Sequence, residues 1–328
     1  MLDQMRRREF IAFLGSMAAA WPLTTHAQQP AMPVVGFLNG ASSHQFGHLV
    51  SAFRTGLSEA GFVEGHNVLI EYRWADGDYN RLPALAAELV NRPVTALAAT
   101  GGSALAAKAA SSTIPIVFIT TDPVRSGLVT SLSRPEGNLT GMAFLTATME
   151  PKRLEILEEL APAATRFAAL LNPDSHLAAS QTKDLLEAGR QIGRTVEILN
   201  AKSASELEAA FATLGQTRSS ALLVTADPFF HSRREQIVML AARYAIPAIY
   251  EWREIVEAGG LMSYGPSITD VYHQAGVYMG RILKGAKTTD LPILQPTKFD
   301  FVINMTTARA LNLSVPSLLL ARADDVIE

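Results

Sequence analysis

The sequence predicts an α/β protein with two lobes, each built on a doubly wound parallel sheet. Short apolar runs alternate with segments of helical periodicity from residue 33 onward, which is typical of a parallel sheet with helices on both faces. The same alternation starts again near residue 151, so two such units follow one another. A less regular stretch beyond residue 265 is expected to cross back to the first lobe.

The first lobe is expected to occupy residues 33–144 together with part of 265–300. Its apolar runs have the length of strands, its periodic segments have the length of helices, and Gly61 is a helix stop signal. We expect strands at 34–38, 68–74, 94–100 and 116–121, and helices at 46–60, 80–90 and 104–110.

The second lobe is expected to occupy residues 145–264 together with part of 300–328. It shows the same periodicities, and its first helix follows Pro151. We expect helices at 152–160, 178–192, 204–211 and 233–244, and strands at 166–171, 195–199, 221–225 and 248–250. In the tail, the pattern predicts a helix at 270–283, a strand at 299–303 and a short helix at 306–311.

The first 27 residues have the layout of a cleaved bacterial export signal. A basic stretch at 6–8 precedes an apolar segment at 11–23, and a small-residue site ends at Ala27. The run Arg7-Arg8-Glu9-Phe10 resembles the twin-arginine type of signal. A membrane anchor is the alternative, but spanning needs about 20 apolar residues. We therefore expect a periplasmic mature protein that begins near residue 28.

Composition and charge exclude several classes of function. The 328 residues are 48% hydrophobic and 18% charged, which suits a packed globular chain. Cleavage after residue 27 would leave 25 basic and 29 acidic side chains, and no basic stripe favours nucleic acid or an anionic membrane surface. The chain has no cysteine, which rules out a thiol nucleophile, a cysteine-ligated metal and a lipid-anchoring cysteine.

The sequence contains no recognisable catalytic motif. The serine elbow, the phosphate-binding loop and the zinc helix are all missing, so neither an enzymatic activity nor a cofactor is expected. His44 and His48 are four residues apart and could ligate a metal, or they could be solvated or face a ligand. Asp76 and Asp78 could form a carboxylate pair for calcium, or a turn that caps the next helix. We favour the reading without a metal in both cases.

Polar and glycine-rich segments follow the predicted strands of the first lobe. In open α/β sheets, ligands bind outside the carboxyl ends of the strands, where the strand order reverses. Glycine and serine before a helix leave N–H groups free for an anion, such as a ligand carboxylate over residues 101–103. The alternative is that these are ordinary turns with capping residues. The candidates are Asn39, Ser42, Ser43, Thr100, Gly101, Gly102, Ser103, Thr121 and Asp122.

The second lobe repeats this arrangement. Asn172 and Asp227 follow two of its predicted strands, and their polar side chains could bind a ligand; a carboxylate could pair with a ligand ammonium. Tyr250 and Tyr264 lie at later strand ends, where an aromatic ring could stack on an apolar or cationic group or serve only in packing.

Seven segments together resemble a known family. They are VVGFL at 34–38, EYRWA at 71–75, IPIVF at 114–118, DPV at 122–124, GLV at 127–129, RPEGNLTG at 134–141 and YG at 264–265. In these segments the chain resembles the substrate-binding proteins of ABC-type uptake systems, in the family related to tryptophan- and tyrosine-binding lipoproteins. Firmicute relatives carry a lipid-anchoring cysteine, which this chain lacks.

The resemblance implies a type I periplasmic-binding fold whose two lobes are joined by about three crossings and close on a solute. It implies ligand contacts from Ser43, Thr100, Gly101, Gly102, Asp122, Asn172, Asp227, Tyr250 and Tyr264. The expected function is a monomeric receptor that delivers a small carboxylate-bearing solute, such as an amino acid or an aromatic acid, to an ABC permease. A binding module for a membrane sensor and an exported hydrolase-type enzyme are the alternatives.

Overall fold

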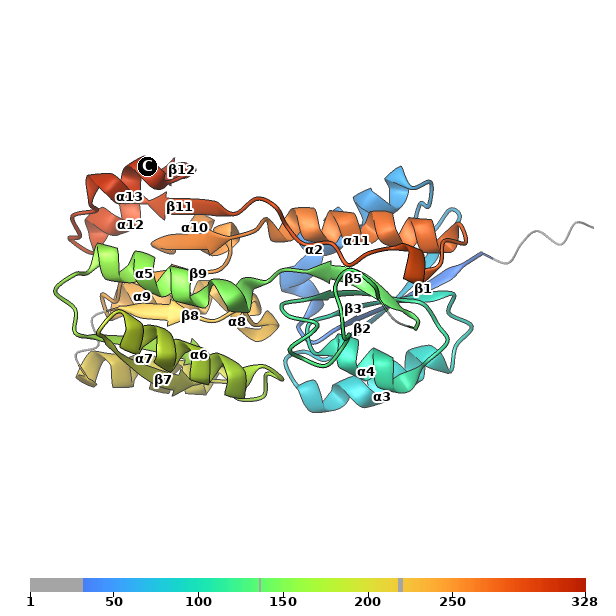
Figure 1. The fold of residues 1–328 in the computed structure, drawn as a ribbon, viewed down its shortest axis with the longest axis horizontal. Helices are drawn as coiled ribbons and strands as arrows, with labels where there is room; N and C mark the ends of the chain where they lie inside the picture. Colours follow the sequence, from blue (N-terminus) through green and yellow to red (C-terminus); the bar gives the residue numbers. More distant parts are fainter. Residues whose placement is uncertain (1–31, 136, 218–220) are drawn as a thin grey trace, which may run out of the picture. The chain divides into compact units, whose positions relative to one another are not determined.

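Two open β-sheets organise the part of the chain that the structure, a computed structural model, describes: residues 32–135, 137–217 and 221–328. The predicted export signal at 1–27 lies outside these residues. The first sheet has the strand order β2-β1-β3-β4-β5, and the second has the order β12-β11-β10-β9-β8-β6-β7. We call each sheet with the helices packed on it a lobe (Figure 1). No helix of the described residues combines the length and the apolar composition needed to cross a bilayer.

The first lobe contains a five-stranded sheet in which every pair of strands is parallel. Its strands are β1 (Val34–Asn39), β2 (Leu69–Trp74), β3 (Ala96–Thr100), β4 (Ile116–Thr120) and β5 (Leu139–Ala143). Its helices are α2 (Ser43–Glu59), η1 (Tyr79–Arg81), α3 (Leu82–Val90), α4 (Ser103–Ala110), α11 (Ile268–Leu283) and η3 (Thr288–Asp290).

Alternation along the buried strands sends side chains to both faces of this sheet. Val35 and Phe37 pack in one hydrophobic cluster with α2 and α11, whereas Leu38 packs in another with α3 and α4. Both faces are therefore covered, as the near-continuous apolar strands predict.

The second lobe contains the seven-stranded sheet. Its strands are β6 (Arg166–Leu171), β7 (Thr195–Asn200), β8 (Leu222–Val224), β9 (Ala248–Tyr250), β10 (Met262–Gly265), β11 (Asp300–Asn304) and β12 (Asp325–Ile327). Its helices are η2 (Thr146–Met149), α5 (Glu150–Leu160), α6 (Ala178–Gln191), α7 (Ala204–Thr217), α8 (Pro228–Ser232), α9 (Arg234–Arg243), α10 (Arg253–Glu257), α12 (Met305–Ala310) and α13 (Ser317–Arg322).

The two-lobed α/β fold predicted from the sequence is confirmed, with one difference in strand direction. The order β7-β6-β8-β9-β10 repeats the order of the first sheet, and all of these neighbours run parallel. The next strand, β11, pairs antiparallel with β10, although β12 beside it is parallel again. The reversal follows from connectivity. The other strands of this sheet end on the side that faces the first lobe, and the chain returns from the first lobe on that side, so β11 begins where they end.

The chain passes between the lobes three times, as predicted. The first passage follows β5, the second lies between β10 and α11, and the third lies between η3 and β11. The guanidinium of Arg153 links two of these passages, because it donates to the carbonyl oxygens of Thr146 at 2.6 Å and Tyr264 at 3.0 Å.

Helices α2 and α11 lie side by side on the first sheet although they are far apart in the sequence (Figure 1). Glycines permit their close approach. A Cβ atom on Gly56 would lie 2.0 Å from the carbonyl oxygen of His273, and one on Gly276 would lie 2.0 Å from that of Phe53. The second helix begins only at residue 268, so the first lobe is completed by chain that follows most of the second lobe.

Candidate ligand-binding site

A cavity lies between the carboxyl ends of the strands of the two lobes; the empty space among its lining residues, including the part open to solvent, is about 410 Å³. Its lining residues come from both lobes and from the passages between them. They are Phe46, Thr100, Gly101, Ile119, Thr120, Thr121, Phe144, Ala226, Asp227, Pro228, His231, Trp252, Ile268 and Tyr272.

The cavity adjoins the point in each sheet where the strand order reverses. In the first lobe this point lies between β1, which ends at Asn39, and β3, which ends at Thr100. In the second lobe it lies between β6, followed by Asn172, and β8, followed by Asp227. Because the loops diverge at such a point, a crevice forms outside the strands, and ligands of open α/β sheets bind there.

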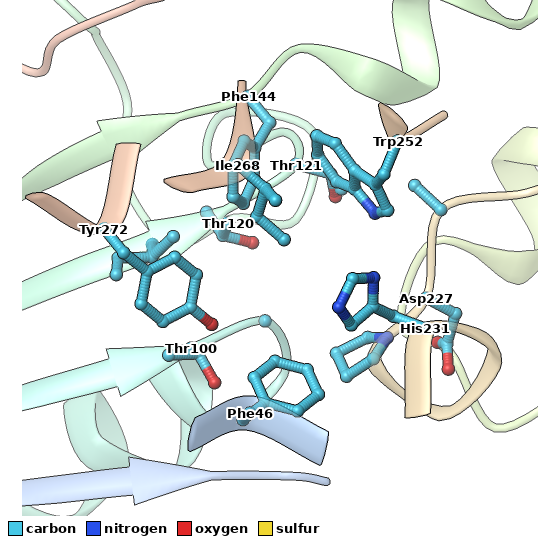
Figure 2. A pocket seen from close by; sticks show the side chains of 14 residues that line it. Phe46, Thr100, Thr120, Thr121, Phe144, Asp227, His231, Trp252, Ile268 and Tyr272 are labelled. Atoms are coloured by element: carbon cyan, nitrogen blue, oxygen red, sulfur yellow. The ribbon is translucent and has the colours of Figure 1, made fainter. Parts of the chain in front are cut away.

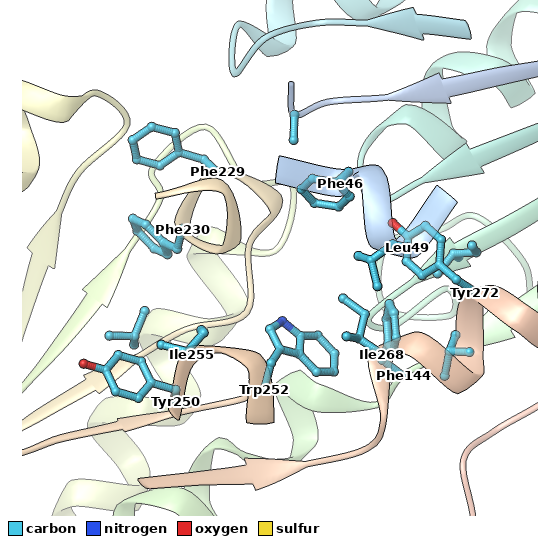
Figure 3. Packing of buried hydrophobic residues seen from close by; sticks show 14 of the residues in the cluster. Phe46, Leu49, Phe144, Phe229, Phe230, Tyr250, Trp252, Ile255, Ile268 and Tyr272 are labelled. Atoms are coloured by element: carbon cyan, nitrogen blue, oxygen red, sulfur yellow. The ribbon is translucent and has the colours of Figure 1, made fainter. Parts of the chain in front are cut away.

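Five of the fourteen lining residues are aromatic (Figure 2). The rings of Phe144 and Trp252 lie 4.8 Å apart at an angle of 60°. Phe46, in the first turn of α2, lies edge-on to His231 at 5.2 Å and 6.5 Å from the ring of Tyr272. One apolar cluster therefore runs from the first lobe into the second (Figure 3), and an aromatic or aliphatic solute would find apolar contacts on several sides.

Hydroxyl groups occupy the first-lobe side of the cavity. Thr100, Thr120 and Thr121 line it at the ends of β3 and β4, and Tyr272 reaches it from α11. The Thr100 side chain is 3% exposed, and its Oγ1 has no hydrogen-bond partner among the described residues, although the Tyr272 hydroxyl lies close by. An unpartnered buried hydroxyl is costly, so a ligand atom that bonds to it is favoured.

The backbone between β3 and α4 is shaped for an anion. Gly101 has a φ of 55°, a left-handed conformation that glycine adopts without strain. The turn leads directly into α4, where the N–H groups of Ala104 and Leu105 already donate to the carbonyl oxygens of Gly101 and Gly102; those of Gly102 and Ser103 are the donors left at its start. Together with the Thr100 hydroxyl, these donors suit a carboxylate at this end of the cavity.

His231 faces the cavity from α8 (Figure 2). It is 1% exposed, and neither ring nitrogen has a hydrogen-bond partner among the described residues. Burial, aided by the positive charge of Arg234, lowers the pKa of His231 to about 3, so the ring is neutral at pH 7. A neutral imidazole has one donor and one acceptor to offer a ligand.

Asp227 lies at the edge of the cavity and joins the two lobes. Its Oδ1 accepts hydrogen bonds from the hydroxyl of Tyr79 in the first lobe at 2.8 Å, from Nδ2 of Asn172 at 3.0 Å and from the backbone N–H of Phe229 at 2.9 Å. Burial raises the pKa of Asp227 to about 6, although these three donors oppose the shift. A second contact between the lobes is the ion pair of Arg125 with Asp184 at 2.5 Å.

Of the residues predicted from the sequence, Thr100, Gly101, Thr121 and Asp227 line the cavity. Asn172 supports it indirectly by holding Asp227. Asn39 and Ser103 are fully buried next to it, with Nδ2 and Oγ unpartnered among the described residues, and Gly102 lies near His176 of the second lobe.

The remaining predicted residues do not line the cavity. Ser42 precedes α2, where its hydroxyl contacts Gln45, and Ser43 is exposed. Asp122 accepts a hydrogen bond from the backbone N–H of Arg125 at 2.9 Å, which caps a turn.

The two predicted tyrosines pack inside the second lobe, the alternative that the sequence left open. Tyr250 is 1% exposed and belongs to the apolar cluster, with its ring against Gly260. Tyr264 stacks on Phe299 with the ring centroids 6.2 Å apart. Neither side chain lines the cavity: Tyr250 belongs to the cluster on one face of the second sheet and Tyr264 packs against the cluster on the other.

Three of the residues considered as metal ligands make other contacts in the structure. Asp78 caps the helix η1 by accepting from the N–H of Asn80 at 3.1 Å, and Asp76 pairs with Arg81 at 3.1 Å, which is the turn that we favoured. His48 lies over His231 with the ring centroids 6.0 Å apart. No group of three or more potential metal ligands occurs among the described residues.

Several lining residues escaped prediction. Phe46 and Tyr272 stand in helices whose sequences show an apolar stripe, which looks the same for a core face as for a cavity wall. His231 lies one helical turn beyond Asp227, and the strand-end rule extended by that turn would have included it; Trp252 directly follows the end of β9, where Tyr250 was chosen instead.

Comparison with known proteins agrees with this architecture. The sequence model described as ABC transporter substrate binding protein matches residues 34–327. A curated tyrosine-binding protein of Clostridioides difficile is 26% identical over 263 residues, which are 80% of this chain and 75% of that protein.

Two solved structures share the fold over 90% of this chain and 99% of theirs. One is a conserved domain protein of Vibrio cholerae, 25% identical with a TM-score of 0.83. The other is an ABC domain of Streptococcus pneumoniae in complex with L-Trp, 24% identical with a TM-score of 0.81. Since the family model spans nearly all of the described chain, the protein belongs to the family of ABC transporter substrate-binding proteins.

Proposed function

We propose that this chain is the periplasmic receptor of an ABC uptake system and that it captures a small carboxylate-bearing solute with an apolar or aromatic body. The solute docks between the lobes, the lobes close on it, and a membrane permease receives it. We further propose export by the N-terminal signal with cleavage near residue 27, action as a monomer, and no chemical turnover of the solute.

One observation carries the proposal: two buried polar side chains, one from each lobe, face the same cavity without partners among the described residues. These are Thr100, which has the Tyr272 hydroxyl close by, and His231. A pair of unpartnered groups at the centre of an aromatic cavity is destabilising in an unoccupied protein and favourable once a polar solute bonds to both. Such groups favour a solute with a polar end and an apolar body.

The relatives support the same class of solute. The curated relative is a tyrosine-binding protein, and the Streptococcus structure holds L-Trp. The aromatic wall formed by Phe46, Phe144, Trp252 and Tyr272 suits a ring of that kind. Closure is favoured only to the extent that the solute binds the closed state better than the open one.

A thermal-shift screen tests the proposal. Residues 28–328 would be refolded to remove any solute carried through purification, then screened against amino acids, aromatic carboxylates, short-chain acids and purines. A solute at a hundred times its Kd adds about 2.7 kcal/mol to the free energy of unfolding. We expect a saturable shift for an aromatic or apolar carboxylate that is recovered chemically unchanged.

A matched pair of variants ties the shift to the cavity. His231→Leu removes both ring nitrogens from the cavity and should abolish or greatly reduce the shift. His66→Leu changes an exposed histidine in the turn before β2 and should leave the shift as in the wild type. A folded protein with no shift across the whole panel, or equal shifts in both variants, would contradict the proposal.

A further inference from the structure

Three charged residues are buried together where two of the passages between the lobes meet the second sheet. They are Glu150 and Arg153 of α5 and Glu251, which directly follows β9, and each is 0% exposed. None of them lines the cavity, so the proposed capture of a solute does not use them. A buried charge is strongly disfavoured unless it is paired and hydrogen-bonded, so the partners of these groups decide which of them is charged.

Arg153 is tied to the backbone of both passages. Its Nε donates to the carbonyl oxygen of Tyr264 at 3.0 Å, and its Nη2 donates to that of Thr146 at 2.6 Å. Its Nη1 has no hydrogen-bond partner among the described residues. The guanidinium therefore holds two passages together and supplies the positive charge of the cluster.

The two carboxyls have few partners. Oε1 of Glu150 accepts a hydrogen bond from Nε2 of Gln181 at 2.6 Å. Oε2 of Glu150 and both carboxyl oxygens of Glu251 have no hydrogen-bond partner among the described residues. Burial without donors disfavours the ionised form of a carboxyl, whereas the protonated form brings no charge into the core.

One guanidinium faces two carboxyls, so a neutral cluster contains one proton more than two carboxylates would hold. Burial raises the pKa of Glu251 to about 8 and that of Glu150 to about 7, although the charge of Arg153 opposes both shifts. The other ionisable groups that act on the cluster are Asp227, Tyr250, Tyr264, Asp184 and Arg125. Of these only Arg125 is a cation, and it is paired with Asp184.

Glu251 lies between the cavity wall and the second passage. The next residue, Trp252, stands in the wall, where its ring lies 4.8 Å from that of Phe144 at the start of the first passage (Figure 3). The carbonyl oxygen of Glu251 lies so close to Gly265 that a Cβ there would be 2.0 Å from it. Water can reach an ionised Glu251 only if contacts of this kind give way.

We infer that Glu150, Arg153 and Glu251 form a proton-binding joint between the lobes: one of the two carboxyls keeps its proton at neutral pH, and release of that proton to solvent at alkaline pH loosens the joint and weakens solute capture. The released proton leaves a second carboxylate that Arg153 alone does not neutralise, and hydration of this carboxylate separates the passages. The inference rests on the proposed function, because affinity registers the loosening only in a receptor that closes on its solute.

Nuclear magnetic resonance tests for the proton without a solute. Residues 28–328, labelled with ¹³C at the glutamate carboxyls, would be titrated between about pH 6.5 and 9. An unperturbed glutamate titrates at about pH 4.3 and is silent in this range. We expect a carboxyl that titrates near pH 8, is missing from Glu251→Gln and is kept in Glu208→Gln, which changes an exposed residue of α7. Wild-type spectra in which no glutamate titrates in this range would overturn the inference, whether or not the variant folds.

Calorimetric titration with L-tyrosine and with L-tryptophan at pH 6.5 and 8.5 tests the link to capture. A proton that is bound only in the closed state changes the Kd by up to about tenfold per pH unit. We expect the Kd of the wild type to rise at least fivefold between the two pH values and that of Glu251→Gln to stay within twofold; titration of the solute itself affects both proteins equally. A solute that binds with the same pH dependence in both proteins would overturn the inference and leave the receptor function intact. Absence of binding by these two solutes and by the whole thermal-shift panel would refute the proposed function, and the inference with it.

Discussion

Replacing Tyr79 by phenylalanine removes one hydroxyl that joins the two lobes. This hydroxyl donates to Oδ1 of Asp227 at 2.8 Å, and the two residues belong to different lobes. The bond therefore exists only when the lobes are closed, whereas both groups are hydrated when the lobes are apart. The substitution leaves the ring in place, so the packing of Tyr79 on Gly40 is kept.

The expected magnitude follows from the charge of the acceptor. A hydrogen bond to a charged group contributes about 1.5–3 kcal/mol. If the unliganded protein is mostly open, the free energy of closure becomes less favourable by this whole amount, and the apparent Kd of any solute rises by roughly 10- to 100-fold. Small-angle X-ray scattering without solute establishes that reference state.

The assay is calorimetric titration of the wild type and the variant with the best solute from the thermal-shift screen. Tyr72→Phe is the matched control, because the Tyr72 hydroxyl lies 3.4 Å from Glu64 within the first lobe and contributes nothing to closure. We expect the control to bind like the wild type. A Tyr79→Phe variant whose Kd stays within twofold of the wild type, with an open unliganded state, would refute the reasoning.

Three further predictions concern the cavity wall, the helix contact and pH. Trp252→Ala removes a ring that lies 4.8 Å from its neighbour in the wall, and calorimetry should show a loss of about 2 kcal/mol in binding, or roughly a 30-fold higher Kd. Gly276→Ala would put a Cβ 2.0 Å from the carbonyl oxygen of Phe53, so urea unfolding should show a free energy of unfolding lower by about 2–3 kcal/mol. The control Gly47→Ala has open space around the new Cβ and should not lower the free energy of unfolding. In the folded protein His231 stays neutral because its pKa is lowered to about 3, whereas in the unfolded chain the ring takes up a proton below pH 6.5. The contribution of His231 to the free energy of unfolding is therefore complete above pH 6.5 and falls by about 2 kcal/mol at pH 5. Urea unfolding of the wild type and of His231→Gln at both pH values would measure this difference. A difference that does not change between pH 7 and pH 5 would contradict the burial of a neutral ring.

Periodicity was sufficient to predict most of the fold, and its failures have physical reasons. Strands buried on both faces are continuous apolar runs, which stand out from the polar loops around them. Strand β5 was missed because Thr140 and Gly141 interrupt Leu139–Ala143, so that no continuous apolar run marks it. The antiparallel direction of β11 depends on where the chain re-enters the second sheet, and periodicity carries no information on that.

The candidate site was predictable in part, because only some of its residues follow a local rule. Thr100 and Asp227 stand at strand ends, where the crevice of an open sheet forms. The roles of Tyr79 and Asn172 depend on which groups meet across the lobes, and the spacing of residues within one lobe cannot reveal such a meeting. The sequence pattern of an aromatic residue likewise does not distinguish a cavity wall from a core, as Tyr272 and Tyr250 illustrate.

The late position of α11 in the chain has a consequence for biosynthesis. The face of the first sheet that α2 covers lacks its second helix until residues 268–283 have left the ribosome, and the second sheet gains β11 and β12 only from residues 300–327. Neither lobe can therefore finish folding during translation of its own strands, and both are completed by the same final segment. A chain that ends before residue 268 would lack α11, β11 and β12 and would expose apolar surface on both lobes at once, so that proteases could recognise the incomplete product.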